Sequence, residues 1–193
     1  MMISPTDVTV YAWAAWFASW MVAALWSSRV ERRSRSQADL TYRLLTAMGA
    51  LLLFDPQLSR RWGAPTLWRA GNTVGWILVA TTISGFAVAW WARITLGRLW
   101  SGSVTRKVDH EIISAGPYRM VRHPIYSGLL LSVVATAALR GTAAAVLGAA
   151  TIGIGLFVKA RVEERFLRSE LGSERYDGYA RRVPMLVPLM RRG

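Results

Sequence analysis

The chain contains no cysteine, only two histidines and few carboxylates. Its 193 residues include 11 Asp and Glu against 24 Lys and Arg. The absence of cysteine excludes disulfides, zinc-thiolate sites and thiol nucleophiles, and two histidines without a carboxylate cluster beside them disfavour a metal site. The net charge of +13 does not predict nucleic-acid binding, because the cations stand between and after apolar segments, where membrane topology explains them better.

Hydrophobic residues make up 53% of the chain and ten residues are Trp, which is typical of a membrane protein. Several apolar segments approach the roughly 20 residues that cross a bilayer core. The sequence therefore predicts an all-α, polytopic integral membrane protein with about five transmembrane helices. We expect them at about 8–26, 40–54, 72–91, 124–139 and 142–158, the second being short.

Three residues set helix boundaries in this prediction. Asn72 is expected to cap the third helix, and Pro124 suits the first position of the fourth. Gly141 follows Arg140 in a turn so short that the fourth and fifth helices must form an antiparallel hairpin. We expect two regions, a three-span membrane region over 1–92 and a core over 93–193 that holds the polar segment, the hairpin and the C-terminal tail.

The distribution of cations predicts the orientation. Only four of the 24 Lys and Arg residues, Arg60, Arg61, Arg69 and Arg140, fall in the two connections on one side of a five-span chain, and the other twenty fall on the opposite side. Basic residues favour the cytoplasmic side. The N-terminus is therefore expected outside, with the polar segment and the tail in the cytoplasm.

The polar segment between the third and fourth helices carries both histidines, His110 and His123. Gly116 and Pro117 force a turn, after which Tyr118, Arg122, His123 and Tyr126 crowd against the start of the fourth helix, where backbone N–H groups favour an anion. Arg122 can grip a carboxylate or phosphate with two parallel bonds. The alternative is a basic collar that holds helix ends to anionic lipid.

The tail supplies the acidic partners. No carboxylate occurs between Glu111 and Glu163, so Glu163 and Glu164 appear just as the fifth span ends, where they would face the Arg122 cluster across the hairpin. The alternative is a solvated helix with pairs such as Glu164 and Arg168. Tyr176 and Tyr179 could likewise be interfacial anchors.

Three stretches in order, LGRLWS, HEIISAGPYRMVRHPIYSG and EERFLRSELGSERYDGYARRVPMLVP, resemble the isoprenylcysteine carboxyl methyltransferase family and its phospholipid methyltransferase relatives. The resemblance covers about residues 93–188. It implies S-adenosylmethionine as methyl donor, held without a Rossmann domain. By position it implies a cofactor pocket lined by His110, Ile113, Tyr118, His123, Tyr126 and Glu163, with Arg122 and Glu164 as catalytic residues nearest the acceptor.

The resemblance leaves the acceptor open. A carboxyl O-methyltransferase acting on an isoprenylcysteine-like or other amphipathic acid is one hypothesis, and an N- or S-methyltransferase acting on a lipid amine or small thiol is the second. A non-catalytic membrane protein that keeps the motif as an anchor is the third, which paired glutamates disfavour. The short, Trp-rich N-terminal half resembles small prokaryotic members, which implies a location in the bacterial inner membrane. The expected partners are membrane lipids and a lipophilic or amphipathic acceptor. The oligomeric state is left open.

Overall fold

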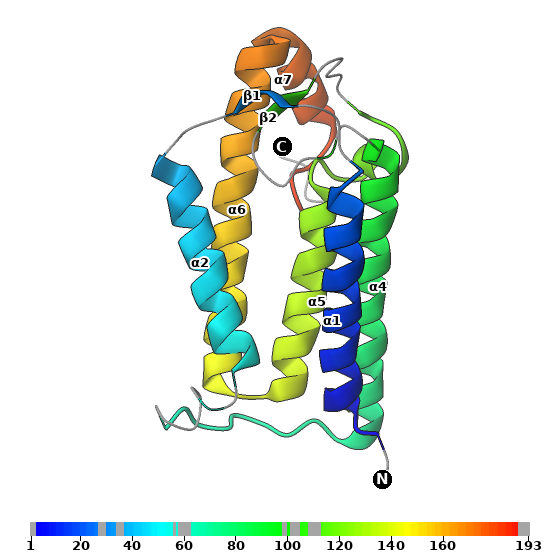
Figure 1. The fold of residues 1–193 in the computed structure, drawn as a ribbon, viewed down its shortest axis with the longest axis vertical. Coiled ribbons are helices and arrows are strands. Elements are labelled where there is room, and N and C mark those ends of the chain that lie inside the picture. Colours follow the sequence, from blue (N-terminus) through cyan, green and yellow to red (C-terminus); the bar gives the residue numbers. More distant parts are fainter. Residues whose placement is uncertain are drawn as a thin grey trace.

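The computed structural model describes residues 3–26, 30–33, 37–55, 57, 63–97, 100, 105–107 and 113–188. Five long helices of this part of the chain run side by side (Figure 1): α1 (Pro5–Ala24), α2 (Gln37–Phe54), α4 (Asn72–Leu96), α5 (Pro124–Arg140) and α6 (Ala143–Leu171). A 3-10 turn, η2 (Gly116–Arg119), precedes α5, and a short helix, α7 (Ser173–Arg182), follows α6. The predicted helical fold is confirmed.

Two short strands were not predicted. β1 (Val30–Arg33) pairs antiparallel with β2 (Thr105–Lys107), with Val30 opposite Lys107 and Arg33 opposite Thr105. The pair joins the connection after α1 to the polar segment after α4, at the end of the bundle that also carries α7 (Figure 1). Pairing between strands so far apart in the sequence leaves no local signal, because each strand has only three or four residues.

Most helix boundaries follow from local chemistry. Pro124 is the first residue of α5, as predicted, and Gly141 ends that helix in the left-handed region at φ 61°, where a residue without Cβ is favoured. Thr142 then caps α6 by accepting the backbone N–H of Ala145 at 3.2 Å. The expected cap at Asn72 is wrong: Gly71 precedes α4 and Asn72 is its first helical residue, without a side-chain cap.

The fifth apolar segment was expected to end near Val158, but α6 continues to Leu171. The apolar run and the helix therefore end at different places. The polar extension is what carries Glu163 and Glu164, so both are fixed on a regular helix instead of a loop.

Glycines bring the helices together in two tight pairs. A Cβ at Gly49 of α2 would lie 2.7 Å from the carbonyl oxygen of Gly148 on α6, and a Cβ at Gly85 of α4 would lie 2.4 Å from that of Gly128 on α5. Such contacts let the backbones approach closely, as at membrane helix interfaces. Ser132 adds a hydrogen bond from α5 to the carbonyl of Thr82 on α4 at 2.8 Å.

A shared apolar core joins the two pairs and α1. Leu53 of α2, Val133 of α5 and Ile152 of α6 are buried together. Trp13 of α1 packs edge-on against Phe54 and Phe86 at ring-centroid distances of 5.2 and 4.7 Å. Its indole N–H also donates to the Thr136 hydroxyl of α5 at 2.9 Å, so these two polar groups of α1 and α5 satisfy each other inside the bundle.

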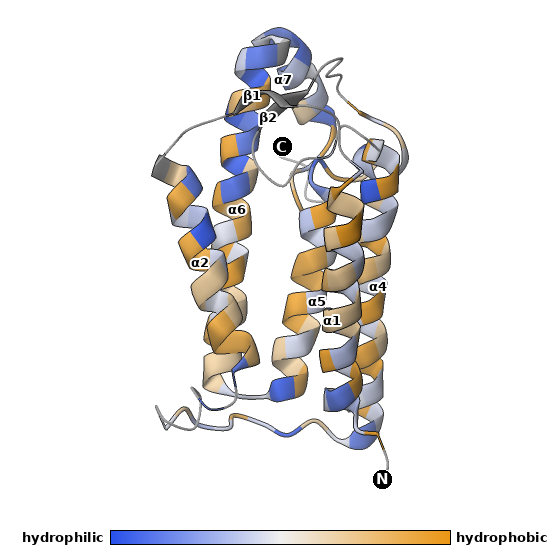
Figure 2. Ribbon diagram, viewed as in Figure 1, coloured by the Kyte–Doolittle hydropathy of each residue, from blue (hydrophilic) through white to orange (hydrophobic). Residues whose placement is uncertain are grey.

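Residues along the middle of the bundle are mostly apolar, and those around α7 are mostly polar (Figure 2). Among the described residues, α4 and α6 are long and apolar enough to cross a membrane, and α5 is a shorter apolar helix. Large hydrophobic side chains face outward on α1, α2 and α5 as well, among them Phe17, Met48 and Val134. The count of five spans and the orientation stay predictions.

Arg93 fastens α1 to α4. Its side chain is fully buried, and Nη2 donates to the carbonyl oxygens of Ala23 and Trp26 at 2.7 Å each. The guanidinium also lies over the rings of Trp26 and Trp100 at 5.3 and 4.6 Å, in cation–π contact. A cation at the C-terminus of α1 adds hydrogen bonds to the last carbonyls of the helix and complements the helix dipole.

Candidate active site

A cluster of charged side chains lies at the end of the bundle where η2, the start of α5, the end of α6 and α7 meet (Figure 1). Glu164 on α6 is the centre of one half of this cluster. Its Oε1 accepts from Arg122 Nε at 2.7 Å and lies 3.3 Å from His123 Nε2. The side chains of Glu164 and Arg122 are only 9% and 12% exposed, so this ion pair is largely screened from water. The predicted meeting of Arg122 with the acidic pair is confirmed.

Arg122 is occupied by the protein. Besides Glu164, its Nη1 donates to the carbonyl oxygen of Ala180 at 2.8 Å and to that of Val183. One guanidinium thereby links three parts of the chain: the residue pair before α5, the acidic pair on α6 and the end of α7. This geometry makes Arg122 a positioning residue for Glu164 and α7, and it differs from the expected bidentate grip on an acceptor.

Glu163 is the centre of the other half. Its Oε1 accepts from the Tyr126 hydroxyl at 2.6 Å, and its Oε2 lies 3.5 Å from His123 Nδ1. The ring of Tyr126 is stacked on that of His123, with centroids 5.4 Å apart and planes 6° from parallel. The Glu163 side chain is 20% exposed, against 9% for Glu164, so it is the carboxylate of the pair that an incoming cation can reach.

His123 lies between both carboxylates and is favoured as imidazolium. Burial by itself would lower the pKa of His123, but hydrogen bonds and charge attraction from Glu163 and Glu164 outweigh burial and raise the pKa above its usual 6.5. With both ring nitrogens facing carboxylate oxygens, the protonated ring can donate in both directions. The net effect is a buried chain of alternating charges, Arg122, Glu164, His123 and Glu163.

Two tyrosines of α7 close the cluster from the outside. Tyr179 donates its hydroxyl to the carbonyl oxygen of Tyr118 at 2.7 Å, and burial raises the pKa of Tyr179 to about 12. Burial also raises the pKa of Tyr118 and Tyr176, so all three stay neutral phenols. The alternative of Tyr176 and Tyr179 as interfacial anchors does not hold, because both side chains are buried within the protein.

The segment after α7 is bound to the start of α5. The backbone N–H groups of Arg122 and His123 donate to the carbonyl oxygens of Pro184 and Met185 at 2.8 and 3.1 Å. The expectation that N–H groups here favour an anion is therefore wrong for these two residues, because tail carbonyls already occupy them. The suggested pairing of Glu164 with Arg168 is wrong as well, since Arg168 bonds to Asp177 of α7 at 2.6 Å.

Of the other three predicted site residues, the structure describes two, Ile113 and Tyr118. Ile113 is half-buried before the Gly116 turn, and Gly116 has φ 53°, the conformation that allows the sharp turn into η2. Tyr118 is buried in η2. His110 lies outside the described residues. Five of the predicted positions, Arg122, His123, Tyr126, Glu163 and Glu164, thus form one connected network.

Comparisons with known proteins identify the family of the chain. The sequence model of the Isoprenylcysteine carboxyl methyltransferase (ICMT) family matches residues 77–169. A probable protein-S-isoprenylcysteine O-methyltransferase of Oryza sativa subsp. indica is 30% identical over 155 residues, which cover 78% of this chain and 74% of that protein. The chain belongs to the isoprenylcysteine carboxyl methyltransferase family. The resemblance seen in the sequence motifs is confirmed.

Two further relatives carry different acceptors in their names. Protein-S-isoprenylcysteine O-methyltransferase B of Arabidopsis thaliana is 29% identical over 145 residues, covering 73% of this chain and 68% of that protein. Methanethiol S-methyltransferase 2 of Bradyrhizobium diazoefficiens is 33% identical over 171 residues, covering 77% of this chain and 58% of that protein. Family membership therefore indicates methyl transfer and leaves the acceptor atom, oxygen or sulfur, undecided.

The family match includes the whole charged network but not α2. Tyr42 of α2 reaches this end of the bundle, where Lys159 of α6 lies over its ring at 5.7 Å and over the ring of Tyr126 at 5.2 Å. Neither Tyr42 nor Lys159 was predicted as a site residue. A tyrosine inside an apolar segment is usually interpreted as a packing residue. Lys159 could have been noticed as a candidate, because it directly follows the apolar run Leu156–Val158.

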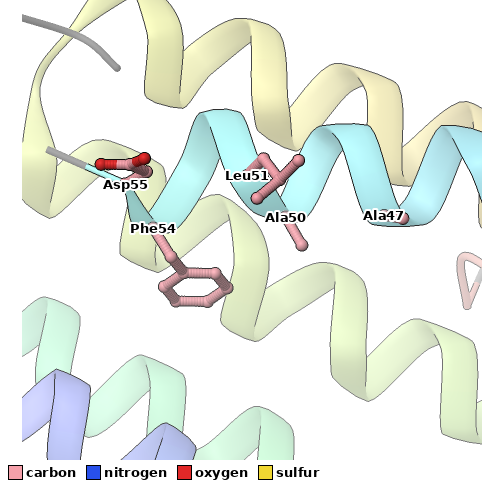
Figure 3. Close-up of a pocket in the computed structure, with 5 residues that line it drawn as sticks. All are labelled: Ala47, Ala50, Leu51, Phe54 and Asp55. Atoms are coloured by element: carbon pink, nitrogen blue, oxygen red, sulfur yellow. The ribbon is translucent and has the colours of Figure 1, made fainter. Parts of the chain in front are cut away.

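A separate apolar pocket lies near the other end of α2. It has a volume of about 400 Å³ and is lined by Ala47, Ala50, Leu51, Phe54 and Asp55 (Figure 3). Apart from Asp55 its lining residues are apolar, and it shares no residue with the charged network. The pocket is therefore separate from the candidate site.

Proposed function

We propose that the protein is an S-adenosylmethionine-dependent methyltransferase of the membrane, which methylates the carboxylate of an isoprenylcysteine-like or other amphipathic acceptor. The observation that carries the proposal is the network of His123, Tyr126, Glu163 and Glu164 at the polar end of an apolar bundle. A water-soluble donor and a lipophilic acceptor can meet only at such a boundary.

The residues present fit the cofactor. The donor carries a sulfonium, an ammonium and a purine, and the site offers the partly exposed carboxylate of Glu163 together with the ring of Tyr126. When bound, it supplies an electrophilic methyl group, which passes to an acceptor oxygen as the S–C bond breaks and the sulfur keeps the electron pair. We propose that His110, Ile113, Tyr118, His123, Tyr126 and Glu163 line this pocket.

The chain's own contribution is alignment and exclusion of water, because a carboxylate nucleophile is already deprotonated and no proton moves. Glu163 is held by Tyr126 and His123, which fixes the carboxylate against a cationic ligand. Arg122 holds Glu164 and the end of α7, which covers the site from the aqueous side. We retain Arg122 and Glu164 as the proposed catalytic residues, with Arg122 acting through Glu164.

The membrane part of the proposal includes five spans, an outside N-terminus and a cytoplasmic site in a bacterial inner membrane. The outward-facing hydrophobic side chains on all five long helices support it, since a soluble surface rarely exposes so much apolar area. The β1–β2 pair also supports it, because it puts two connections that were expected in the cytoplasm at the same end of the bundle. We retain 1–92 and 93–193 as proposed regions.

The direct test is transfer of radiolabelled methyl from S-adenosylmethionine into extracts of membranes that contain the protein, followed by treatment with base. A carboxyl ester releases labelled methanol, whereas S-methyl and N-methyl products keep the label. Stable label would favour the second candidate, an S- or N-methyltransferase, which the methanethiol S-methyltransferase relative suggests. No incorporation above membranes without the protein would refute methyltransferase activity.

A binding experiment locates the cofactor pocket independently of the acceptor. The purified protein in detergent should gain thermal stability with S-adenosylhomocysteine, because a ligand of the folded state shifts unfolding. His123→Ala and Tyr126→Ala should weaken this effect. Tyr11→Ala is the matched control, since Tyr11 of α1 is 70% exposed on the outside of the bundle. Wild-type affinity in both site variants would show that the pocket lies elsewhere.

A further inference from the structure

Tyr42 on α2 holds a polar atom that nothing in the described structure satisfies. The residue is 5% exposed, and its hydroxyl is buried without a hydrogen-bond partner. Buried hydroxyl groups are almost always bonded, because an unpaired one loses its water without compensation. The unpaired Tyr42 hydroxyl at the edge of the proposed active site is therefore a candidate hydrogen-bond donor to a ligand.

Lys159 of α6 brings a positive charge to the same place. Its Nζ lies 5.7 Å from the ring centroid of Tyr42 and 5.2 Å from that of Tyr126. The residue directly follows the apolar run Leu156–Val158 of α6, and an ionisable residue in or beside a membrane span is often functional. One helical turn later the same face carries Glu163, the acceptor of the Tyr126 hydroxyl.

Three helices thus meet around Lys159 of α6, whose ammonium lies near the ring of Tyr42 on α2 and the ring of Tyr126 on α5. Tyr126 in turn stacks on His123 in the charged network. A group bound between Tyr42 and Lys159 lies directly beside the proposed methyl donor.

We propose that Tyr42 Oη and Lys159 Nζ form the subsite for the anionic head group of the acceptor, a carboxylate at the membrane boundary. The hydroxyl donates one hydrogen bond and the ammonium a charge-assisted one, which leaves a carboxylate oxygen for the methyl group. This inference rests on the proposed function and specifies its substrate class. It assigns the recognition of the acceptor to α2, outside the family match of residues 77–169.

The subsite has a selectivity that can be measured without turnover. Detergent-purified protein is titrated with N-acetyl-S-farnesylcysteine and with its carboxamide, which has the same tail and no charge. Wild type should bind the acid at least about tenfold more tightly than the amide. Lys159→Gln should abolish the preference, and Tyr42→Phe should reduce it severalfold. Arg161→Gln is the matched control, because Arg161 is an exposed cation on the same helix and its loss should keep the preference.

The result is interpreted separately from the proposed function. Variants must keep wild-type stabilisation by S-adenosylhomocysteine, which shows that they fold and that the donor site is intact. Equal binding of acid and amide by wild type overturns the subsite, and so does an acid preference that persists in both variants. Methyl transfer to a thiol with no transfer to the acid would instead refute the proposed acceptor, whatever the binding shows.

Discussion

Replacing Arg122 by lysine tests whether the guanidinium holds the site together. The substitution keeps the charge but replaces a planar fork with a single ammonium. Arg122 reaches Glu164 through Nε and the carbonyls of Ala180 and Val183 through Nη1. An ammonium has three donors on a single atom, so it cannot take both the position of Nε beside Glu164 and the position of Nη1 beside the two carbonyls at the end of α7. We expect Arg122→Lys to keep the ion pair and to lose the contacts with α7.

The size of the effect follows from these contacts. A hydrogen bond that involves a charged group contributes about 1.5 to 3 kcal/mol, and the side chain is only 12% exposed, so water replaces the lost bonds poorly. A net loss of about 2 to 4 kcal/mol in the docking of α7 is expected after partial replacement. Since about 1.4 kcal/mol is a factor of ten, the ratio of docked to open α7 should fall by about 30-fold to about 700-fold.

Hydrogen exchange of the α7 amides measures this ratio, because local opening limits exchange there. Arg119→Lys is the matched control: the same substitution three residues earlier, at an exposed side chain. Methyl transfer by Arg122→Lys should fall with the protection of α7, whereas Arg119→Lys should resemble wild type in both. Equal protection of α7 in the two variants would refute the positioning role of Arg122.

Three further predictions concern topology, packing and pH. A reporter fused after Gly193 should read cytoplasmic and one near Gly141 external, and an external C-terminus would contradict the five-span arrangement. Gly85→Leu should prevent stable expression because its Cβ would meet Ser132 and the Gly128 carbonyl, whereas Gly153→Ala, whose Cβ has its nearest neighbour at 3.5 Å, should express normally. His123 has a folded-state pKa above the unfolded value of 6.5. Its protonation should therefore stabilise the folded protein fully below about pH 6.5, and this stabilisation should be lost as the pH rises through the folded-state pKa. Thermal unfolding of wild type across this range should show the loss, and an identical pH profile in His123→Gln would contradict it.

The sequence predicted those parts of the structure that local rules determine. Pro124 and Gly141 placed the hairpin because proline and glycine restrict or permit backbone angles directly. The hairpin then placed Glu163 and Glu164 opposite Arg122, since two antiparallel helices of known length leave little choice. The meeting of the acidic pair with the basic cluster could therefore be predicted before any distance was known.

The missed features depend on contacts between distant segments. Asn72 has the chemistry of a cap, yet Gly71 takes that position, because the course of the preceding loop decides where α4 begins. Arg122 was expected to be available to a ligand, and only the path of the tail beyond α7 shows that Ala180 and Val183 occupy it. Tyr42 gave no signal, since a single tyrosine in an apolar helix is usually packing and its unpaired hydroxyl appears only in three dimensions.

The bonds of Arg93 have a consequence for anyone who wishes to divide this protein into fragments. The expected border between residues 92 and 93 falls inside α4, in front of the residue that holds the end of α1. A fragment that starts at residue 93 would carry a buried guanidinium without the carbonyls of Ala23 and Trp26. For fragment complementation the chain should therefore be divided within the connection 63–71. This leaves α4 whole, and Arg93 can then bind the carbonyls of Ala23 and Trp26 across the two fragments.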